Sequence, residues 1–301
     1  MPPSRRRVAR LSSAAGRAAP VASARAARSS LAPDGPSSPV GRTPVPGWEG
    51  RLTTCSLASS VRGIVSRDVT VLVPPGYSDE STATRRYPVL YMHDGNNCLD
   101  ADGFGHGGWQ VHSVSYDLVQ RGLAAPAIFV LVANTTSRAQ EYVPGFGAAP
   151  GPSADGYLDF IERDVIPFVE ARHRTLPGPA NRGVGGSSYG GLISLYAAWT
   201  RPQTFGLAMA MSTALAYDFP GLVGATGKPA LRIYLDSGTT DSRGGDDGMA
   251  RTIALRDLLV SKGFVLSVDL WHEVGQGDSH SENYWRRRLP IALSFLYPPL
   301  K

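Results

Sequence analysis

The sequence predicts an α/β fold, with a doubly wound, mostly parallel sheet and helices on both faces. Two observations lead to this prediction. Short apolar segments alternate with segments that have the period of an amphipathic helix, which is typical of parallel strands joined by helical crossovers. Several of the apolar segments contain almost no polar residue, as expected for strands that are covered on both faces.

The predicted strands are short runs bounded by Gly, Pro or polar turn residues. They are Arg67–Val73, Val89–Met92, Ile128–Ala133, Gly183–Gly186, Leu207–Met211, Leu231–Leu235 and Val265–Trp271. The predicted helices are Gln110–Gln120, Gly156–Ala171, Gly190–Trp199, Met249–Lys262 and His280–Phe295. Ligands bind beyond the carboxyl ends of the strands in such sheets, so we expect the chemistry in the strand-to-helix turns.

Composition divides the 301-residue chain into an extension and one domain. Residues 1–42 contain eight arginines and one acid and are rich in Ala, Ser and Pro, so we expect a disordered N-terminal extension. The arginines also suit a twin-arginine or transit segment, so the expected cytoplasmic location has export or an organelle as its alternative. We expect residues 43–301 to form one α/β domain.

The charge distribution argues against a nucleic-acid partner. The net charge is +5, but the residues after position 42 hold 22 basic and 24 acidic side chains. No apolar run approaches the ~20 residues that a membrane helix needs, so we expect no membrane span. Cys55 and Cys98 match no disulfide framework or metal motif, and we expect two free thiols and no metal or other cofactor. The oligomeric state stays open.

A glycine-rich turn after the predicted strand Gly183–Gly186 carries a nucleophile motif. Residues 185–191 read GGSSYGG and precede an apolar helix pattern, the context that a G-x-S-x-G elbow requires. The elbow brings together the residues two before and two after the nucleophile, so both must be small. Around Ser188 both are glycine, whereas around Ser187 one is Tyr189. We therefore predict Ser188 as the nucleophile.

A serine hydroxyl needs a neighbouring base, and histidine suits this role near neutral pH. The order along the chain in folds with this elbow is serine, acid, histidine, which leaves His272 and His280. His272 continues the predicted strand Val265–Trp271, where we expect it to be packed. His280 lies in a glycine-rich loop before the final helix, and we predict it as the general base.

The acid that orients the imidazole should follow the predicted strand Leu231–Leu235. Four aspartates lie there: Asp236, Asp241, Asp246 and Asp247. We expect Asp236 to hold the turn at the strand end and the last two to cap the helix that begins at Met249. Asp241, in the loop between, is the predicted acid.

A tetrahedral intermediate needs two N–H donors. The residue after the nucleophile, Tyr189, supplies one, and we predict the N–H of Asn96 as the other because Gly95 allows a close backbone approach. His93 and Asp94 lack a second cluster with metal-ligand spacing, so we expect them to shape the turn.

Other side chains have a functional and a packing interpretation. Trp109, Tyr142 and Phe146 are candidates for the walls of an acyl pocket, with packing as the alternative. We expect Trp285 to pack the final helix on the sheet and Arg286–Arg288 to be a solvated basic run. Residues 212–230 are too few for a helical cap, so we expect no separate lid domain and an open site that prefers short-chain or aromatic acyl groups.

Several segments together resemble the putative esterase family of α/β-hydrolases. They are YPVLYMHDGNN, RAQEYVPG, DFIERDVIPFVEARHRT, GGSSYGGLISLYAA, LDSGTTD and GDSHSENYW, within residues 51–297. The family includes enterochelin-type esterases, S-formylglutathione hydrolases, feruloyl esterases and mycolyltransferases. The resemblance implies an α/β-hydrolase catalytic domain with Ser188, Asp241 and His280 as its triad and an oxyanion hole at Asn96 and Tyr189. Dedicated enterochelin esterases look to have an extra N-terminal domain that we do not expect here, and for this reason we do not expect siderophore hydrolysis.

Together these residues predict a serine carboxylester hydrolase that acts on a small-molecule ester through an acyl-enzyme. Two alternatives stay open. The same triad would serve an acyltransferase, and the same fold would serve a non-catalytic binding protein.

Overall fold

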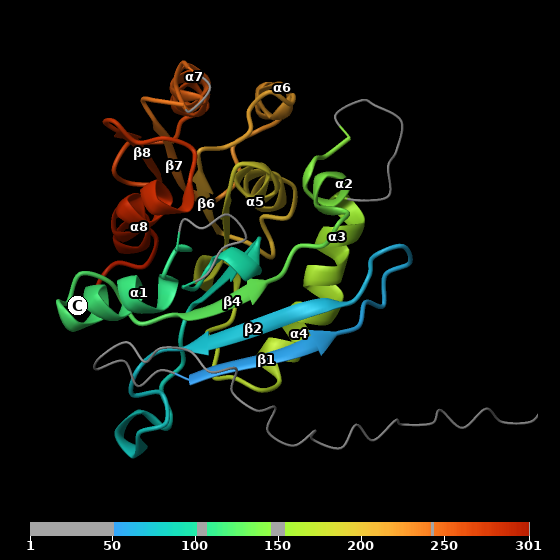
Figure 1. The fold of residues 1–301 in the computed structure, drawn as a ribbon, viewed down its shortest axis with the longest axis vertical. Helices are drawn as coiled ribbons and strands as arrows, with labels where there is room; N and C mark the ends of the chain where they lie inside the picture. Colours follow the sequence, from blue (N-terminus) through green and yellow to red (C-terminus); the bar gives the residue numbers. More distant parts are fainter. Residues whose placement is uncertain (1–50, 101–106, 146–153, 242–243, 301) are drawn as a thin grey trace, which may run out of the picture. The chain divides into compact units, whose positions relative to one another are not determined.

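The computed structural model describes residues 51–100, 107–145, 154–241 and 244–300, so the expected extension lies outside the described residues. The described residues form an eight-stranded sheet in the order β1-β2-β4-β3-β5-β6-β7-β8 (Figure 1). The strands are β1 Arg51–Leu57, β2 Arg67–Val73, β3 Val89–Met92, β4 Ile128–Val132, β5 Arg182–Ser187, β6 Leu207–Met211, β7 Arg232–Gly238 and β8 Leu270–Gly275. Strands β3 to β8 are parallel to their neighbours within this group, and β1 and β2 are antiparallel, so the predicted mostly parallel sheet is confirmed.

Helices cover both faces of this sheet (Figure 1). They are α1 Val111–Gln120, α2 Arg138–Tyr142, α3 Ala154–Phe160, α4 Ile166–Glu170, α5 Tyr189–Thr200, α6 Phe219–Ala225, α7 Met249–Ser261 and α8 Glu282–Leu296, with a π-helical segment, Ile161–Val165, between α3 and α4. Alternate residues of β3 enter different cores: Tyr91 packs with α3 and α5, whereas Leu90 and Met92 pack with α1 and α8. Burial on both faces explains why the central strands are almost wholly apolar.

Two strands differ from the prediction. The edge strand β1 was not predicted, because an exposed strand with the sequence RLTTCSL has no continuous apolar run. Strand β8 begins at Leu270 instead of Val265. The residues before it form a turn, in which Asp269 Oδ1 accepts from Val265 N–H at 2.6 Å and Ser267 has a φ of 64°. Apolar residues in this turn, such as Val268, are exposed, so their hydropathy imitates a strand.

No described helix is both long and apolar enough to cross a membrane. All residues between β6 and β7 are described, and their one regular element is the seven-residue helix α6. This stretch therefore holds no separate helical cap, as expected from its length.

Candidate active site

Ser188 occupies a one-residue turn between β5, which ends at Ser187, and α5, which begins at Tyr189. Its backbone has a φ of 57° and a ψ of −121°, a strained conformation for a residue other than glycine. A Cβ atom added to Gly186 would lie 2.9 Å from the carbonyl carbon of Gly190, so the turn requires a small residue there. Ser188 is half-buried and Ser187 is buried. The geometry is that of the predicted elbow, with Ser188 at its apex.

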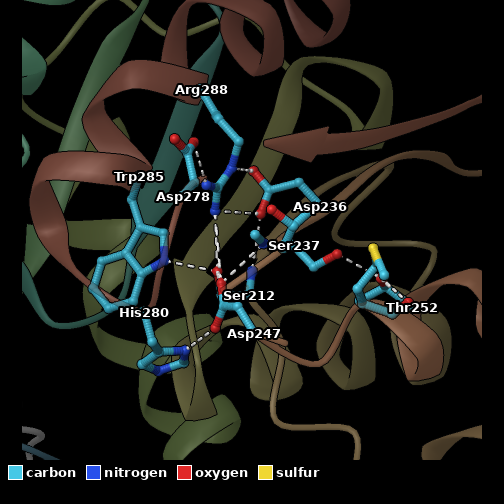
Figure 2. Close-up of polar contacts among 12 residues, drawn as sticks. Ser212, Asp236, Ser237, Asp247, Thr252, Asp278, His280, Trp285 and Arg288 are labelled. Atoms are coloured by element: carbon cyan, nitrogen blue, oxygen red, sulfur yellow. Dashed lines mark hydrogen bonds and ion pairs between the residues drawn. The ribbon is translucent and has the colours of Figure 1, made fainter. Parts of the chain in front are cut away.

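His280 precedes α8 and forms a close pair with Asp247. Its Nδ1 lies 2.6 Å from Asp247 Oδ1, and the imidazole is 39% exposed whereas the carboxylate is 2% exposed (Figure 2). The Trp285 ring stands edge-on to the imidazole, with centroids 5.1 Å apart. A buried carboxylate that accepts from Nδ1–H leaves Nε2 as the ring nitrogen able to take up a proton.

The aspartate that pairs with His280 in the structure is Asp247, whereas the sequence favoured Asp241 as the acid. Asp241 lies in a turn, where its N–H donates to the Gly245 carbonyl at 3.0 Å. The neighbouring Asp246 caps α7, because its carboxylate accepts from the Met249 and Ala250 N–H groups at 3.0 and 3.3 Å.

Asp247 is turned away from α7 because its segment folds back onto the end of β7. The Asp247 N–H donates to the Gly238 carbonyl at 3.3 Å, and Asp247 Oδ2 accepts from the Gly238 N–H at 3.1 Å. This exchange with β7 positions the carboxylate beside the loop that carries His280. Spacing along the chain did not reveal the position of Asp247, because two adjacent aspartates before a helix resemble two capping residues.

Arg288 is buried, which corrects the expectation of a solvated basic run. Its Nε lies 2.9 Å from Asp236 Oδ2 and its Nη1 lies 2.7 Å from Asp278 Oδ2, and its side chain is 4% exposed (Figure 2). Burial raises the pKa of Asp236, while Arg288 acts to lower it. The spacing in the sequence could have indicated this burial, because Arg288 lies three residues after Trp285 and so shares the inward face of α8 with it.

The predicted oxyanion donors flank the elbow. Asn96 belongs to a 3₁₀ turn, Gly95–Asn97, that follows β3, and Tyr189 is the first residue of α5. Among the described residues, no acceptor is bonded to either of these N–H groups. The loop after β3 lies against the elbow, because a Cβ atom added to Gly190 would lie 3.2 Å from Asp94 Oδ2. Gly95 itself is required by packing, since its added Cβ would lie 2.5 Å from the Leu131 carbonyl carbon of β4.

An ion pair and a buried histidine hold this loop. Arg138 of α2 donates to both carboxylate oxygens of Asp94, at 2.6 and 2.7 Å. His93 Nδ1 lies 2.8 Å from the Tyr157 hydroxyl, and burial, aided by Arg138 and Arg67, lowers the pKa of His93 to about 3. His93 is therefore a neutral structural residue. No group of three His, Cys, Asp or Glu side chains in the described ranges could hold a metal ion.

His272 is a strand residue, as expected. It lies in β8 in register with Leu235, and its Nε2 is 3.3 Å from Thr252 Oγ1 of α7. Burial, together with Arg256, lowers the pKa of His272 to about 4. It is thus packed against α7.

Two of the three candidate wall residues pack in the interior. Trp109 and Tyr142 are buried, and Phe146 lies outside the described residues. Two half-buried aromatic side chains meet at the start of α5: Tyr189, the residue after Ser188, and Tyr217, whose hydroxyls are 3.2 Å apart. Sequence reasoning missed Tyr217, which lies between β6 and α6.

Comparisons with known proteins point in one direction. The family profile described as "Putative esterase" matches residues 65–296. The uncharacterized protein YbbA of Bacillus subtilis is 24% identical over 246 residues, which cover 77% of this chain and 93% of YbbA. The siderophore triacetylfusarinine C esterase of Aspergillus fumigatus is 30% identical over 156 residues, or 48% of this chain and 50% of the fungal protein. The chain thus spans about half of that esterase.

Solved structures share the fold. A ferulic acid esterase superimposes with a TM-score of 0.63 at 20% identity, covering 82% of this chain and 98% of that one. The enterobactin esterase FES from Shigella flexneri has a TM-score of 0.64 at 22% identity and covers 82% of this chain, which spans 58% of that structure. The predicted α/β-hydrolase fold is therefore confirmed.

Proposed function

The chain belongs to the putative esterase family and is a carboxylic ester hydrolase, and on this premise we propose that it cleaves small esters through an acyl-enzyme on Ser188. The observation that carries the proposal is the conformation of Ser188, with a φ of 57° at the start of α5. A positive φ at a serine stores backbone strain, and strain of this kind clusters at active sites, where it presents a side chain to the substrate.

In the proposed mechanism, Ser188 Oγ attacks the ester carbonyl carbon while His280 Nε2 takes up the hydroxyl proton. The Asp247 carboxylate accepts from Nδ1–H at 2.6 Å, which holds the required tautomer and stabilises the imidazolium. The carbonyl oxygen becomes an oxyanion that accepts from the N–H groups of Asn96 and Tyr189.

Collapse of this intermediate breaks the bond to the alcohol, which leaves with the proton from His280. Water then attacks the acyl carbon with His280 again as base, and the carboxylic acid departs as Ser188 regains its proton. The positive end of the α5 dipole lies at Ser188 and favours the negative charge in both steps.

We propose short-chain or aromatic acyl groups as substrates. The residues between β6 and β7 supply only the short helix α6, which leaves little apolar cover for a long acyl chain. Tyr189 and Tyr217 offer half-buried aromatic rings beside Ser188, 5.9 Å apart between centroids. The fold likeness to a ferulic acid esterase suits an aromatic acyl group.

The test combines labelling with turnover. A serine-reactive phosphonate should label Ser188, and Ser188→Ala should lower kcat for p-nitrophenyl acetate and methyl ferulate by roughly 10⁴-fold or more. Ser187→Ala is the matched control, and its kcat should fall far less. Equal losses from both variants, or no label on Ser188, would refute the proposal. Product analysis with an added alcohol separates hydrolysis from acyl transfer.

A further inference from the structure

Ser212 lies directly after β6, next to the segment that holds Ser188. The carbonyl of Met211 accepts from the Ser188 N–H at 3.0 Å. Ser212 has a φ of 43°, and its N–H is bonded to the carbonyl and the carboxylate of Asp236, at 3.1 and 2.9 Å. A non-glycine residue in the left-handed region, held at its backbone by a buried acid, has a tightly defined side-chain position.

The hydroxyl of Ser212 has three partners, and their chemistry sets its direction. It lies 2.9 Å from Trp285 Nε1 and 3.0 Å from Arg288 Nη2, and it also contacts Asp247 Oδ2 (Figure 2). Indole and guanidinium nitrogens only donate hydrogen bonds. Ser212 Oγ must therefore accept from both of them, and its own proton has to point to Asp247.

Arg288 cannot move away from this hydroxyl. Its guanidinium is also bonded to Asp236 and Asp278, which are buried, so three further hydrogen bonds hold it in place. Trp285 and Arg288 reach Ser212 from one face of α8, the helix that directly follows the His280 loop. The hydroxyl thus connects this helix to the acid.

We propose that Ser212 is a positioning residue, which orients the Asp247 carboxylate so that Oδ1 faces His280. With Ser212 Oγ–H and the Gly238 N–H both donating to Oδ2, rotation of the carboxylate would break two hydrogen bonds. The proposal rests on the triad proposed above. A purely structural role is the alternative, in which the hydroxyl only satisfies the buried donors of Trp285 and Arg288.

Two variants remove the hydroxyl. Ser212→Ala keeps the unfavourable positive φ, and Ser212→Gly relieves it, so a loss common to both belongs to the hydroxyl and not to the backbone. We expect kcat for p-nitrophenyl acetate to fall by roughly 10- to 100-fold in both, with KM nearly unchanged, because the acid is misplaced and not the substrate. Ser237→Ala is the matched control, since Ser237 is equally buried but bonds to Thr252 Oγ1 at 2.9 Å and not to Asp247.

The second measurement needs no substrate. The Nδ1 proton of His280, in a 2.6 Å bond to a carboxylate, should give a proton NMR resonance far downfield. We expect this resonance to broaden or move upfield in both Ser212 variants and to persist in Ser237→Ala. Because it reports on Asp247 and His280 directly, it tests Ser212 even if the wild-type protein cleaves no ester.

Wild-type kcat and an unchanged resonance in the Ser212 variants, with a Tm loss like that of Ser237→Ala, would overturn the proposal. If neither variant folds, Ser212→Cys keeps the shape and weakens the donor. It should then show an intermediate loss of kcat and a shifted resonance, and wild-type values for both would overturn the proposal equally.

Discussion

Replacement of Asp247 by asparagine is the sharpest test of the acid, because the structure dictates how the new amide must sit. Asp247 Oδ2 accepts from the Gly238 N–H at 3.1 Å and from the Ser212 hydroxyl. An asparagine would therefore turn its carbonyl oxygen toward these two donors. Its NH₂ group would then face His280 Nδ1 and donate to it.

This orientation selects the wrong tautomer of His280. An Nδ1 that accepts a hydrogen bond leaves the proton on Nε2, and Nε2 can no longer take the proton of Ser188. Loss of the correct tautomer in a serine triad costs about 10⁴-fold in kcat, or about 5 kcal/mol of barrier. We expect a loss of this size for Asp247→Asn.

The assay is kcat and KM for p-nitrophenyl acetate, with Tm measured on the same samples to confirm folding. Asp241→Asn is the matched control, since Asp241 is the aspartate that the sequence favoured. We expect it to change kcat by less than about threefold, as is usual for residues that do not touch the reacting groups. A large loss in Asp241→Asn together with near wild-type activity in Asp247→Asn would refute the assignment.

Three further outcomes are expected. Rates from acetyl to palmitoyl esters should peak at short chains, and a jump above the micellar limit would contradict an open site. The free energy of unfolding should fall as pH drops from about 6.5 toward 3, because burial keeps the pKa of His93 at about 3 whereas the unfolded chain takes up the proton. Urea unfolding at pH 7 and pH 5 should show a smaller fall in this free energy for His93→Asn than for the wild type. An equal fall in both proteins would count against this explanation. Gly186→Ala should lower both Tm and kcat, because its Cβ would lie 2.9 Å from Gly190. In the control Gly63→Ala the new Cβ would have no atom within 4 Å, so only backbone strain should lower Tm and kcat should stay unchanged. Equal effects of the two variants on kcat would argue against the elbow.

Most of the parallel strands and their helices could be predicted from the sequence, because each depends on residues within one segment. The apolar runs of β3, β4 and β6 are buried on both faces, and that burial is what makes them continuous. The edge strand β1 lacks such a run and was not predicted. Helix α6 was not predicted because it has only seven residues, which include a proline and two glycines, the residue types typical of turns. The start of β8 was misplaced because apolar residues also occur in an exposed turn.

The elbow at Ser188 is also local, which is why its geometry followed from the spacing of two glycines. A turn of one residue between a strand and a helix brings together the residues two before and two after it, and a Cβ atom added to Gly186 would lie 2.9 Å from the Gly190 carbonyl carbon. Asn96 and Tyr189 likewise follow the ends of β3 and β5, so the position of their N–H groups beyond the carboxyl ends of these strands was predictable.

The sequence by itself determined the fold class, the turn that presents Ser188, and the loop that carries His280. Only the tertiary structure decided which aspartate meets that histidine and that Arg288 is buried. Both depend on contacts that form only after folding. The segment that contains Asp247 folds back onto the end of β7. Helix α8 packs on the sheet so that Arg288 contacts Asp236 and Asp278. An aspartate that caps a helix and one that orients an imidazole are the same residue type at similar spacing. What separates them is the set of donors that surrounds each carboxylate after folding.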